Sequence, residues 1–156
     1  MPSAMSGGRA MVVVAVFLTG CAAPRADPIA TAQPEEEVEL GAIMGVVQRH
    51  TQKLGYSIAR RNAPLATFYL EELEETVAEV YELEAHDGMV IGQPARTTLE
   101  PMVGPLSDRV AVEDWEGAHT GYVALIDACN RCHAATEHEF IVILEPEGPS
   151  PYNQAF

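Results

Sequence analysis

Basic residues are scarce in this 156-residue chain, where 9 Lys and Arg stand against 23 Asp and Glu, for a net charge of −14. Without a basic stripe the chain lacks the electrostatic surface that nucleic-acid phosphates need, and anionic lipid headgroups would repel it. Aromatic residues are also few, at 6%, yet 47% of the residues are apolar. That content is too high for a disordered acidic segment and sufficient for one domain. The composition predicts one acidic globular domain whose partners are cationic or neutral surfaces.

The chain begins with a short apolar run that is typical of a secretion signal. Residues 10–18 are almost entirely aliphatic and follow Arg9. The run is too short to cross a bilayer of ~30 Å as a helix, but it fits the hydrophobic part of a signal peptide. It ends in Leu-Thr-Gly before Cys21, which resembles the bacterial lipobox. We expect residues 1–20 to be a lipoprotein signal peptide and Cys21 to be lipidated; the alternative is an ordinary signal with Cys21 incidental.

This reading places the domain in the bacterial cell envelope, on the periplasmic side of a membrane to which the lipid anchors it. Residues 21–39 contain small residues, prolines and a cluster of Glu, without a core pattern. Such a composition predicts a flexible tether between the anchor and the domain.

Cysteine is rare, and the two cysteines after Cys21 stand close together. Residues 129–133 read Cys-Asn-Arg-Cys-His, and Cys-x-x-Cys-His is the attachment signature of c-type haem. On a helix these cysteines and the histidine share one face, so that two thiols reach the two vinyl groups of one porphyrin edge while the imidazole reaches iron. The motif predicts one covalent haem c held by Cys129 and Cys132, with His133 as the proximal iron ligand.

Two other uses of the motif remain open. A redox disulfide of the thioredoxin type would need a strand-to-helix context. A zinc site built from Cys129, Cys132, His133 and one further His or Glu would usually need a second pair of ligands at similar spacing. The sequence contains no second Cys pair. A haem-free metal or redox-thiol lipoprotein is therefore a less favoured alternative.

The apolar spacing predicts an all-α fold. Residues recur on one helical face in four segments, and Asn62 with Pro64 is a typical start for the second of them. Four amphipathic helices joined by short loops form an up-down four-helix bundle over residues 40–144, followed by an irregular Pro-rich tail over residues 145–156. The expected helices are residues 40–60, 64–84, 98–110 and 112–138.

Breaks and connections are predicted from Gly and Pro. Residues 86–88 (His-Asp-Gly) should end the second helix, and residues 88–97 should form a loop. Gly104 and Pro105 should kink or interrupt the third helix. The apolar residues 140–144 are expected to cover the end of the bundle, or alternatively to lie extended across the haem edge.

The motif in this setting resembles the class II c-type cytochromes, the cytochrome c′ group. The sequence is also similar to small bacterial haem proteins with a Met-Gly-x-x-Gln-x-His first helix and a Phe-Ile-x-Ile tail, here at residues 44–50 and 140–143. The resemblance implies a haem-binding four-helix bundle that transfers electrons or binds small gases at a vacant iron position. The chain departs from class II cytochromes in having Leu40, where their Arg-x-x-x-Met pattern would place Arg before Met44.

The ligand opposite His133 should come from the first helix. His50 lies on its apolar stripe and is the expected distal ligand, because a partner of His133 should lie well inside that helix. Met44 is the alternative, and an empty sixth position is the third possibility. Arg49 and Arg131 are candidate partners of the haem propionates.

The other histidines are not expected to ligate the haem iron. His86 and His119 do not share the stripe of the haem motif and are expected on the surface. His138 could hydrogen-bond a propionate, although exposure to solvent is the favoured expectation.

The sequence does not indicate an enzyme, because it supplies no pocket with an acid–base pair. The favoured function is one-electron transfer, and the alternative is binding of NO or CO. Glu residues of the second helix form either a solvated face or a docking patch for a redox partner with a cationic face. They are Glu71, Glu72, Glu74, Glu75, Glu79 and Glu82.

Overall fold

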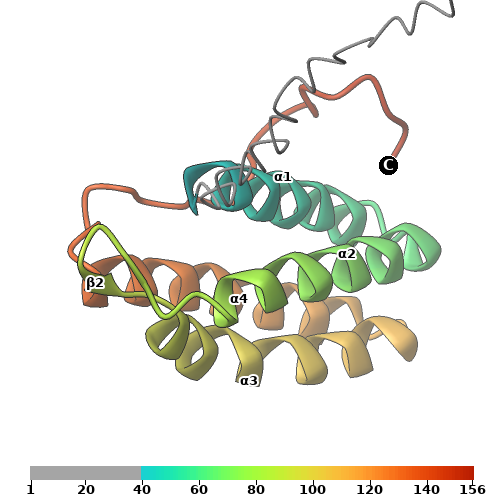
Figure 1. Cartoon of the computed structure of the whole chain (residues 1–156). Coiled ribbons are helices and arrows are strands. Elements are labelled where there is room, and N and C mark those ends of the chain that lie inside the picture. The colour runs from blue at the N-terminus through green and yellow to red at the C-terminus, as the bar shows by residue number, and fades with distance from the viewer. Residues whose placement is uncertain (1–39) are drawn as a thin grey trace, which may run out of the picture. The chain divides into compact units, whose positions relative to one another are not determined.

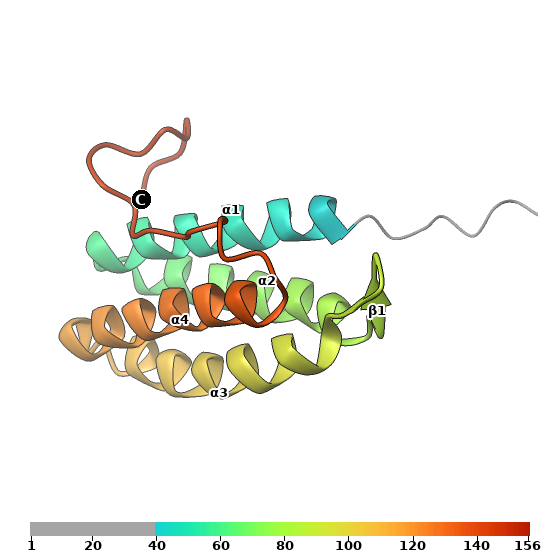
Figure 2. The ribbon, with the colours of Figure 1, turned by 90° about the vertical axis from the view of Figure 1, so that its left-hand side faces the viewer.

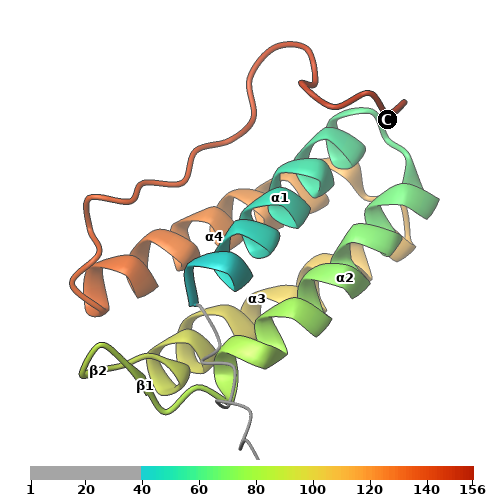
Figure 3. The same ribbon diagram turned by 45° about the horizontal axis from the view of Figure 1, so that its top comes forward.

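Residues 40–156 are the part of the chain that the structure, a computed structural model, describes. They form four helices and one small hairpin (Figure 1). Consecutive helices run antiparallel (Figure 3), which confirms the predicted all-α, up-down four-helix bundle. The elements are α1 (Leu40–Ala59), α2 (Ala63–Tyr81), β1 (Ala85–His86), β2 (Met89–Val90), α3 (Gly92–Ala111) and α4 (Trp115–Ala135).

The expected signal peptide, the lipidation site Cys21 and the tether fall within residues 1–39 and lie outside the described residues. Among residues 40–156, no helix has the length and apolar content needed to cross a membrane.

Side-chain caps begin the second and fourth helices. The Asn62 side chain accepts a hydrogen bond from the backbone N–H of Leu65 at 3.2 Å, which confirms the predicted N-cap of α2. Asp114 caps α4 through the backbone N–H of Gly117 at 3.0 Å. This backbone hydrogen bond, with a smaller contribution from Arg109, lowers the pKa of Asp114. Helix α4 is shorter than the predicted residues 112–138, because Glu113 and Glu137 adopt left-handed φ values of 55° and 59° just outside its ends.

The connection between α2 and α3 differs from the predicted loop over residues 88–97. Ala85 pairs with Val90 and His86 with Met89 in an antiparallel hairpin. Its turn contains Asp87 and Gly88, both with positive φ, at 50° and 82°. Asp-Gly is a strong signal for a two-residue hairpin turn, and in the structure it forms this turn and not the predicted end of the second helix.

Helix α3 begins earlier than expected and is not interrupted. It starts at Gly92 rather than at Thr98, and it continues through both Pro101 and Pro105. Both prolines are exposed, so solvent can satisfy the carbonyl groups that they leave without an N–H partner. The predicted interruption is therefore wrong, and the helix curves along its length instead (Figure 2).

Helices α1 and α4 make the fewest contacts of the neighbouring helix pairs. Near the middle of α1, the buried Tyr122 hydroxyl of α4 donates a hydrogen bond to the Thr51 carbonyl at 3.0 Å. A Cβ on Gly55 would lie 2.6 Å from Cζ of Tyr122. Glycine at this position thus leaves room for the Tyr122 ring against the α1 backbone.

Replacement Gly55→Ala is expected to destabilise the domain by about 1–3 kcal/mol, because the added methyl group overpacks a filled contact. Gly104→Ala is the matched control, since a Cβ on this exposed helical glycine meets no atom within 4 Å. It should be neutral or stabilising by up to about 1 kcal/mol through helix propensity. Thermal unfolding of both variants tests this, and equal melting temperatures would contradict the packing described.

Residues 140–144, called the strap below, turn back from the end of α4 and run along the bundle (Figure 2). The favoured expectation, that they cover the end of the bundle, is wrong. The Asn130 side chain bonds both backbone groups of Ile143, which holds the strap beside α4 in an extended course, as in the alternative expectation. The physical reason is that the extended backbone needs hydrogen-bond partners, and Asn130 supplies two.

The predicted tail over residues 145–156 has no helix or strand, as expected, but it packs on the bundle. The Tyr152 hydroxyl donates to Oε1 of Gln52, and the Tyr69 hydroxyl to Oε1 of Gln154, each at 2.7 Å. The Phe156 ring lies 5.3 Å from the Tyr56 ring. These contacts attach the tail to α1 and α2.

Candidate functional site

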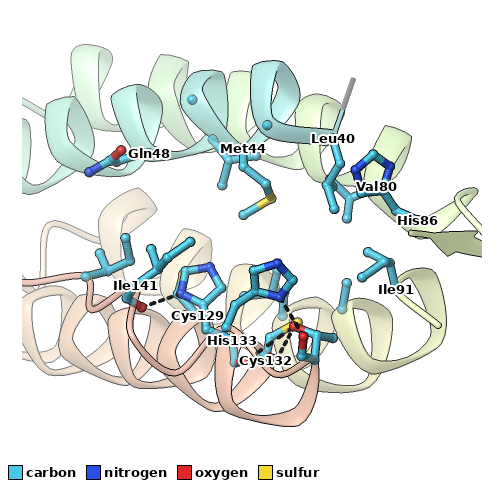
Figure 4. Close-up of a pocket in the computed structure, with 18 of the residues that line it drawn as sticks. Leu40, Met44, Gln48, Val80, His86, Ile91, Cys129, Cys132, His133 and Ile141 are labelled. Atoms are coloured by element: carbon cyan, nitrogen blue, oxygen red, sulfur yellow. Dashed lines mark hydrogen bonds between the residues drawn. The ribbon is translucent and has the colours of Figure 1, made fainter. Parts of the chain in front are cut away.

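A cavity of about 420 Å³ lies where α1 and α4 separate, next to the hairpin (Figure 4). Its volume is in the range of cofactor-binding cavities. Five parts of the chain build its walls: the first half of α1, Val80 near the end of α2, the hairpin with the start of α3, the end of α4, and the strap. Among the lining residues are Leu40, Met44, Gln48, Thr51, His86, Ala95, Leu99, Cys129, Cys132, His133, His138, Ile141 and Ile143.

The three residues of the haem motif share one wall of this cavity. Cys129, Cys132 and His133 are all buried and all line it from α4. Their spacing of three and four residues places them on one helical face. Both thiols are free. The structure therefore brings together the two predicted attachment sites and the predicted proximal ligand.

Burial raises the pKa of both motif thiols in the folded chain. Burial, and secondarily the nearby Cys132, raises the pKa of Cys129 to about 12. Burial likewise raises the pKa of Cys132. Redox-active cysteines instead have a lowered pKa, because the thiolate is the attacking species. This protonation state disfavours the redox-thiol alternative. Among the described residues, no three His, Cys, Asp or Glu side chains are grouped so that they could hold a metal ion by themselves.

The His133 ring is held in one orientation by the strap. Its Nδ1 lies 2.8 Å from the carbonyl oxygen of Ile141. A carbonyl only accepts, so we assign the ring proton to Nδ1, which donates to Ile141. Nε2 of the neutral ring then carries the free lone pair. In Figure 4 the His133 ring stands in the space between α4 and α1. Metal-ligating histidines commonly have this arrangement, with the second nitrogen donating to a carbonyl.

The α1 wall, opposite the motif, is bare at two glycines and also carries Met44 and the polar residues Gln48 and Thr51. A Cβ on Gly41 or on Gly45 would meet no atom within 4 Å, so open space lies over the α1 backbone at both positions. Between them, the Met44 side chain points into the cavity toward α4 (Figure 4). A flat group can therefore approach α1 closely, with a thioether sulfur facing it.

His50, the expected distal ligand, does not line the cavity. Its Nδ1 lies 3.5 Å from Oγ1 of Thr76, and its ring lies 6.2 Å from the Tyr69 ring, both on α2. The apolar stripe of α1 is wide enough to face both α2 and the cavity, and His50 is on the α2 side. In addition α4 ends at Ala135, so the first turns of α1, which carry Met44, face His133. The structure places Met44 at the cavity, and it does not place His50 there.

The remaining predicted residues divide between the cavity and the surface. His86 was expected on the surface, but the hairpin brings it, half-buried, to the cavity. His138 is also half-buried there, rather than exposed. His119 is exposed, as expected. Arg49 and Arg131 are exposed and do not line the cavity.

Thr51 is a cavity residue that the sequence did not reveal. Its hydroxyl is buried and has no hydrogen-bond partner among residues 40–156. A buried hydroxyl is normally satisfied by the chain or by a bound molecule. Its position three residues after Gln48 and seven after Met44 is the signal that could have placed it on the same face.

No protein-family model, curated protein or solved structure matches this chain. What the chain does must therefore be argued from the chemistry of the cavity itself.

The cavity residues fit a covalently attached haem. Two free thiols and a histidine with its Nε2 lone pair available line one wall, while the opposite wall has two bare glycines and a thioether. The buried Thr51 hydroxyl adds a polar atom that a bound group or its water could satisfy. Cys129 and Cys132 would hold the group through thioethers, and His133 would ligate its iron.

Proposed function

We propose that this protein is a c-type cytochrome that transfers single electrons through one haem attached to Cys129 and Cys132. The observation that carries the proposal is the state of His133 beside the two free thiols: its Nδ1 proton is donated to Ile141, which leaves Nε2 for iron. A bound haem would supply a one-electron couple at its iron. The chain would supply attachment, an axial ligand and an apolar enclosure.

Met44 completes the proposed coordination from α1. A His–Met pair gives a higher potential than a His–His pair, and saturated coordination suits electron transfer. The cavity walls are largely aliphatic, including Leu40, Leu99 and Ile143. Such walls exclude water and slow ligand entry, which fits a carrier rather than an enzyme.

Gas binding is the second candidate function. Met44 is half-buried at the edge of the hydrophobic core and lies next to two glycines whose Cβ positions are open. Methionine is unbranched and flexible, so Met44 would be a displaceable ligand, and a bound haem would supply a binding site for NO or CO.

Visible spectra of the protein matured in a periplasm separate the two functions. Oxidised, reduced, and reduced samples with carbon monoxide are compared. An electron carrier should give sharp, separated reduced bands that carbon monoxide leaves unchanged. A broad reduced band that shifts with the gas would overturn electron transfer as the main function and favour gas binding.

The cell-envelope location belongs to the same proposal. Haem attachment of this type takes place outside the cytoplasm, in agreement with a signal peptide over residues 1–20 and a lipidated Cys21. The mass of the mature protein tests the anchor, since an unacylated N-terminus would contradict it. A membrane-bound carrier would then meet its redox partners in the periplasm.

The proposed partners have a cationic docking face. Glu71, Glu75 and Glu79 are exposed on α2, and the chain carries a net charge of −14. Such a surface steers positively charged proteins toward it, and salt weakens this attraction. Electron-transfer rates to a cationic partner should therefore fall with ionic strength, and rates independent of salt would contradict this docking mode.

A further inference from the structure

Three hydrogen bonds attach the strap to α4, and on the helix they involve Asn130 and His133. Asn130 Nδ2 donates to the Ile143 carbonyl at 2.9 Å, and the Ile143 N–H donates to Asn130 Oδ1 at 2.8 Å. One turn further along α4, His133 Nδ1 donates to the Ile141 carbonyl at 2.8 Å. The Asn130 amide thus pairs with the strap as a neighbouring β-strand would, through one donor and one acceptor.

Few other interactions hold this segment in place. The side chains of Phe140, Val142 and Leu144 point outward and are 76%, 62% and 76% exposed. Ile141 and Ile143 face the cavity, and Ile143 is partly buried against the core. Because four of the five apolar side chains of the strap are exposed, Ile141 among them at 43%, hydrogen bonds must supply much of its attachment.

The attachment at Asn130 determines where the Ile141 carbonyl lies. Ile141 and Ile143 are two residues apart on an extended backbone, and Asn130 and His133 are one turn apart on a rigid helix. Fixing Ile143 on Asn130 therefore fixes the Ile141 carbonyl opposite Nδ1 of His133. Without the two bonds to Asn130, only the hydrogen bonds from His133 to the Ile141 carbonyl and from the Ile141 N–H to the His138 carbonyl would remain, and they would have to order the segment beyond Ile141 against its conformational entropy.

We propose that Asn130, which stands between the two cysteines, is a positioning residue for His133: its amide clamps the strap so that the Ile141 carbonyl orients the imidazole and strengthens it as an iron ligand. The proposal rests on the proposed haem function. A carbonyl that accepts from Nδ1 raises the basicity of the ligating nitrogen, and outer partners of this kind commonly change metal affinity 10–100-fold. A more basic ligand favours ferric over ferrous iron.

Two measurements on the haem-loaded Asn130→Ala variant test the clamp. Alanine is compatible with the helix, so α4 should remain intact. Amide hydrogen exchange at Ile143 should become about tenfold faster, as one lost hydrogen bond implies. The midpoint potential should rise by about 59 mV, which corresponds to a tenfold change for a one-electron couple. Val142→Ala, on the exposed side of the same strap, is the matched control and should change neither quantity.

The outcomes distinguish the clamp from the haem function itself. Unchanged exchange at Ile143 in Asn130→Ala would overturn the clamp. Faster exchange with an unchanged potential would overturn the link to His133 and leave Asn130 a purely structural residue. If the unaltered chain acquires no covalent haem, the proposed function fails, but exchange at Ile143 still reports whether Asn130 holds the strap.

Discussion

Loss of both motif cysteines, in the double variant Cys129→Ala/Cys132→Ala, is expected to abolish covalent haem completely. The two thioethers are the proposed attachment, and the cavity offers no other thiol, since Cys129 and Cys132 are the cysteines of the described chain. Each single variant should retain one thioether at most, so its yield of denaturation-resistant haem should fall below that of the unaltered chain. Haem that stays with the polypeptide on a denaturing gel is the quantity to measure.

A control separates attachment from folding in this experiment. Cys129→Ser and Cys132→Ser keep a small polar side chain but remove the thiol, so they should lose haem as the alanine variants do. Circular dichroism reports whether the four helices remain. A folded double variant with an unaltered yield of denaturation-resistant haem would refute attachment at these residues.

Replacement Met44→Ala is expected to open the sixth iron position. Met44 points into the cavity from α1, toward the wall that carries His133. Its loss should convert a low-spin iron to high-spin and make the reduced protein bind carbon monoxide. The potential should fall by at least ~100 mV, because axial ligands set haem potentials over a range of about 0.8 V.

The matched control for this experiment is His50→Ala, on the same helix. His50 contacts Thr76 and Tyr69 of α2 and does not line the cavity. Its removal should leave the spin state and the carbon monoxide response unchanged. A conversion to high-spin iron in His50→Ala, with Met44→Ala silent, would contradict the placement of the two residues in the structure.

The sequence predicted the fold because its signals were local. Apolar periodicity located four helices, and the short polar caps at Asn62 and Asp114 begin two of them in the structure. The Cys-x-x-Cys-His spacing also placed Cys129, Cys132 and His133 on one face before any tertiary information. These features depend on residues a few positions apart, which a single sequence displays.

The choice between His50 and Met44 depended on tertiary contacts that periodicity does not show. Both residues lie at the edges of the broad apolar face of α1, and only the positions of α2 and α4 determine which edge meets the cavity. Because α4 ends at Ala135, His133 lies only two residues before the end of that helix. It is therefore closer to the first turns of α1 than the predicted end at residue 138 implied. Glu137, just beyond that end, has a left-handed φ of 59°, and its residue type does not predict this backbone conformation.

The favoured expectations for the strap and for the hairpin were wrong for different reasons. Asn130 lies between the two motif cysteines, and its pairing with Ile143 joins residues separated by 13 positions across a chain reversal. The hairpin signal at Asp87 and Gly88 was present but was read as a helix end. The hairpin matters because it carries His86 to the cavity.

The most direct test is the intact mass of the chain after expression with haem-attachment machinery, recorded under denaturing conditions. The proposed function predicts a polypeptide heavier by exactly one haem, with the added mass on the peptide that contains Cys129 and Cys132. A chain recovered at the mass of its polypeptide and acyl groups alone, from cells that load another c-type cytochrome, would contradict the proposal.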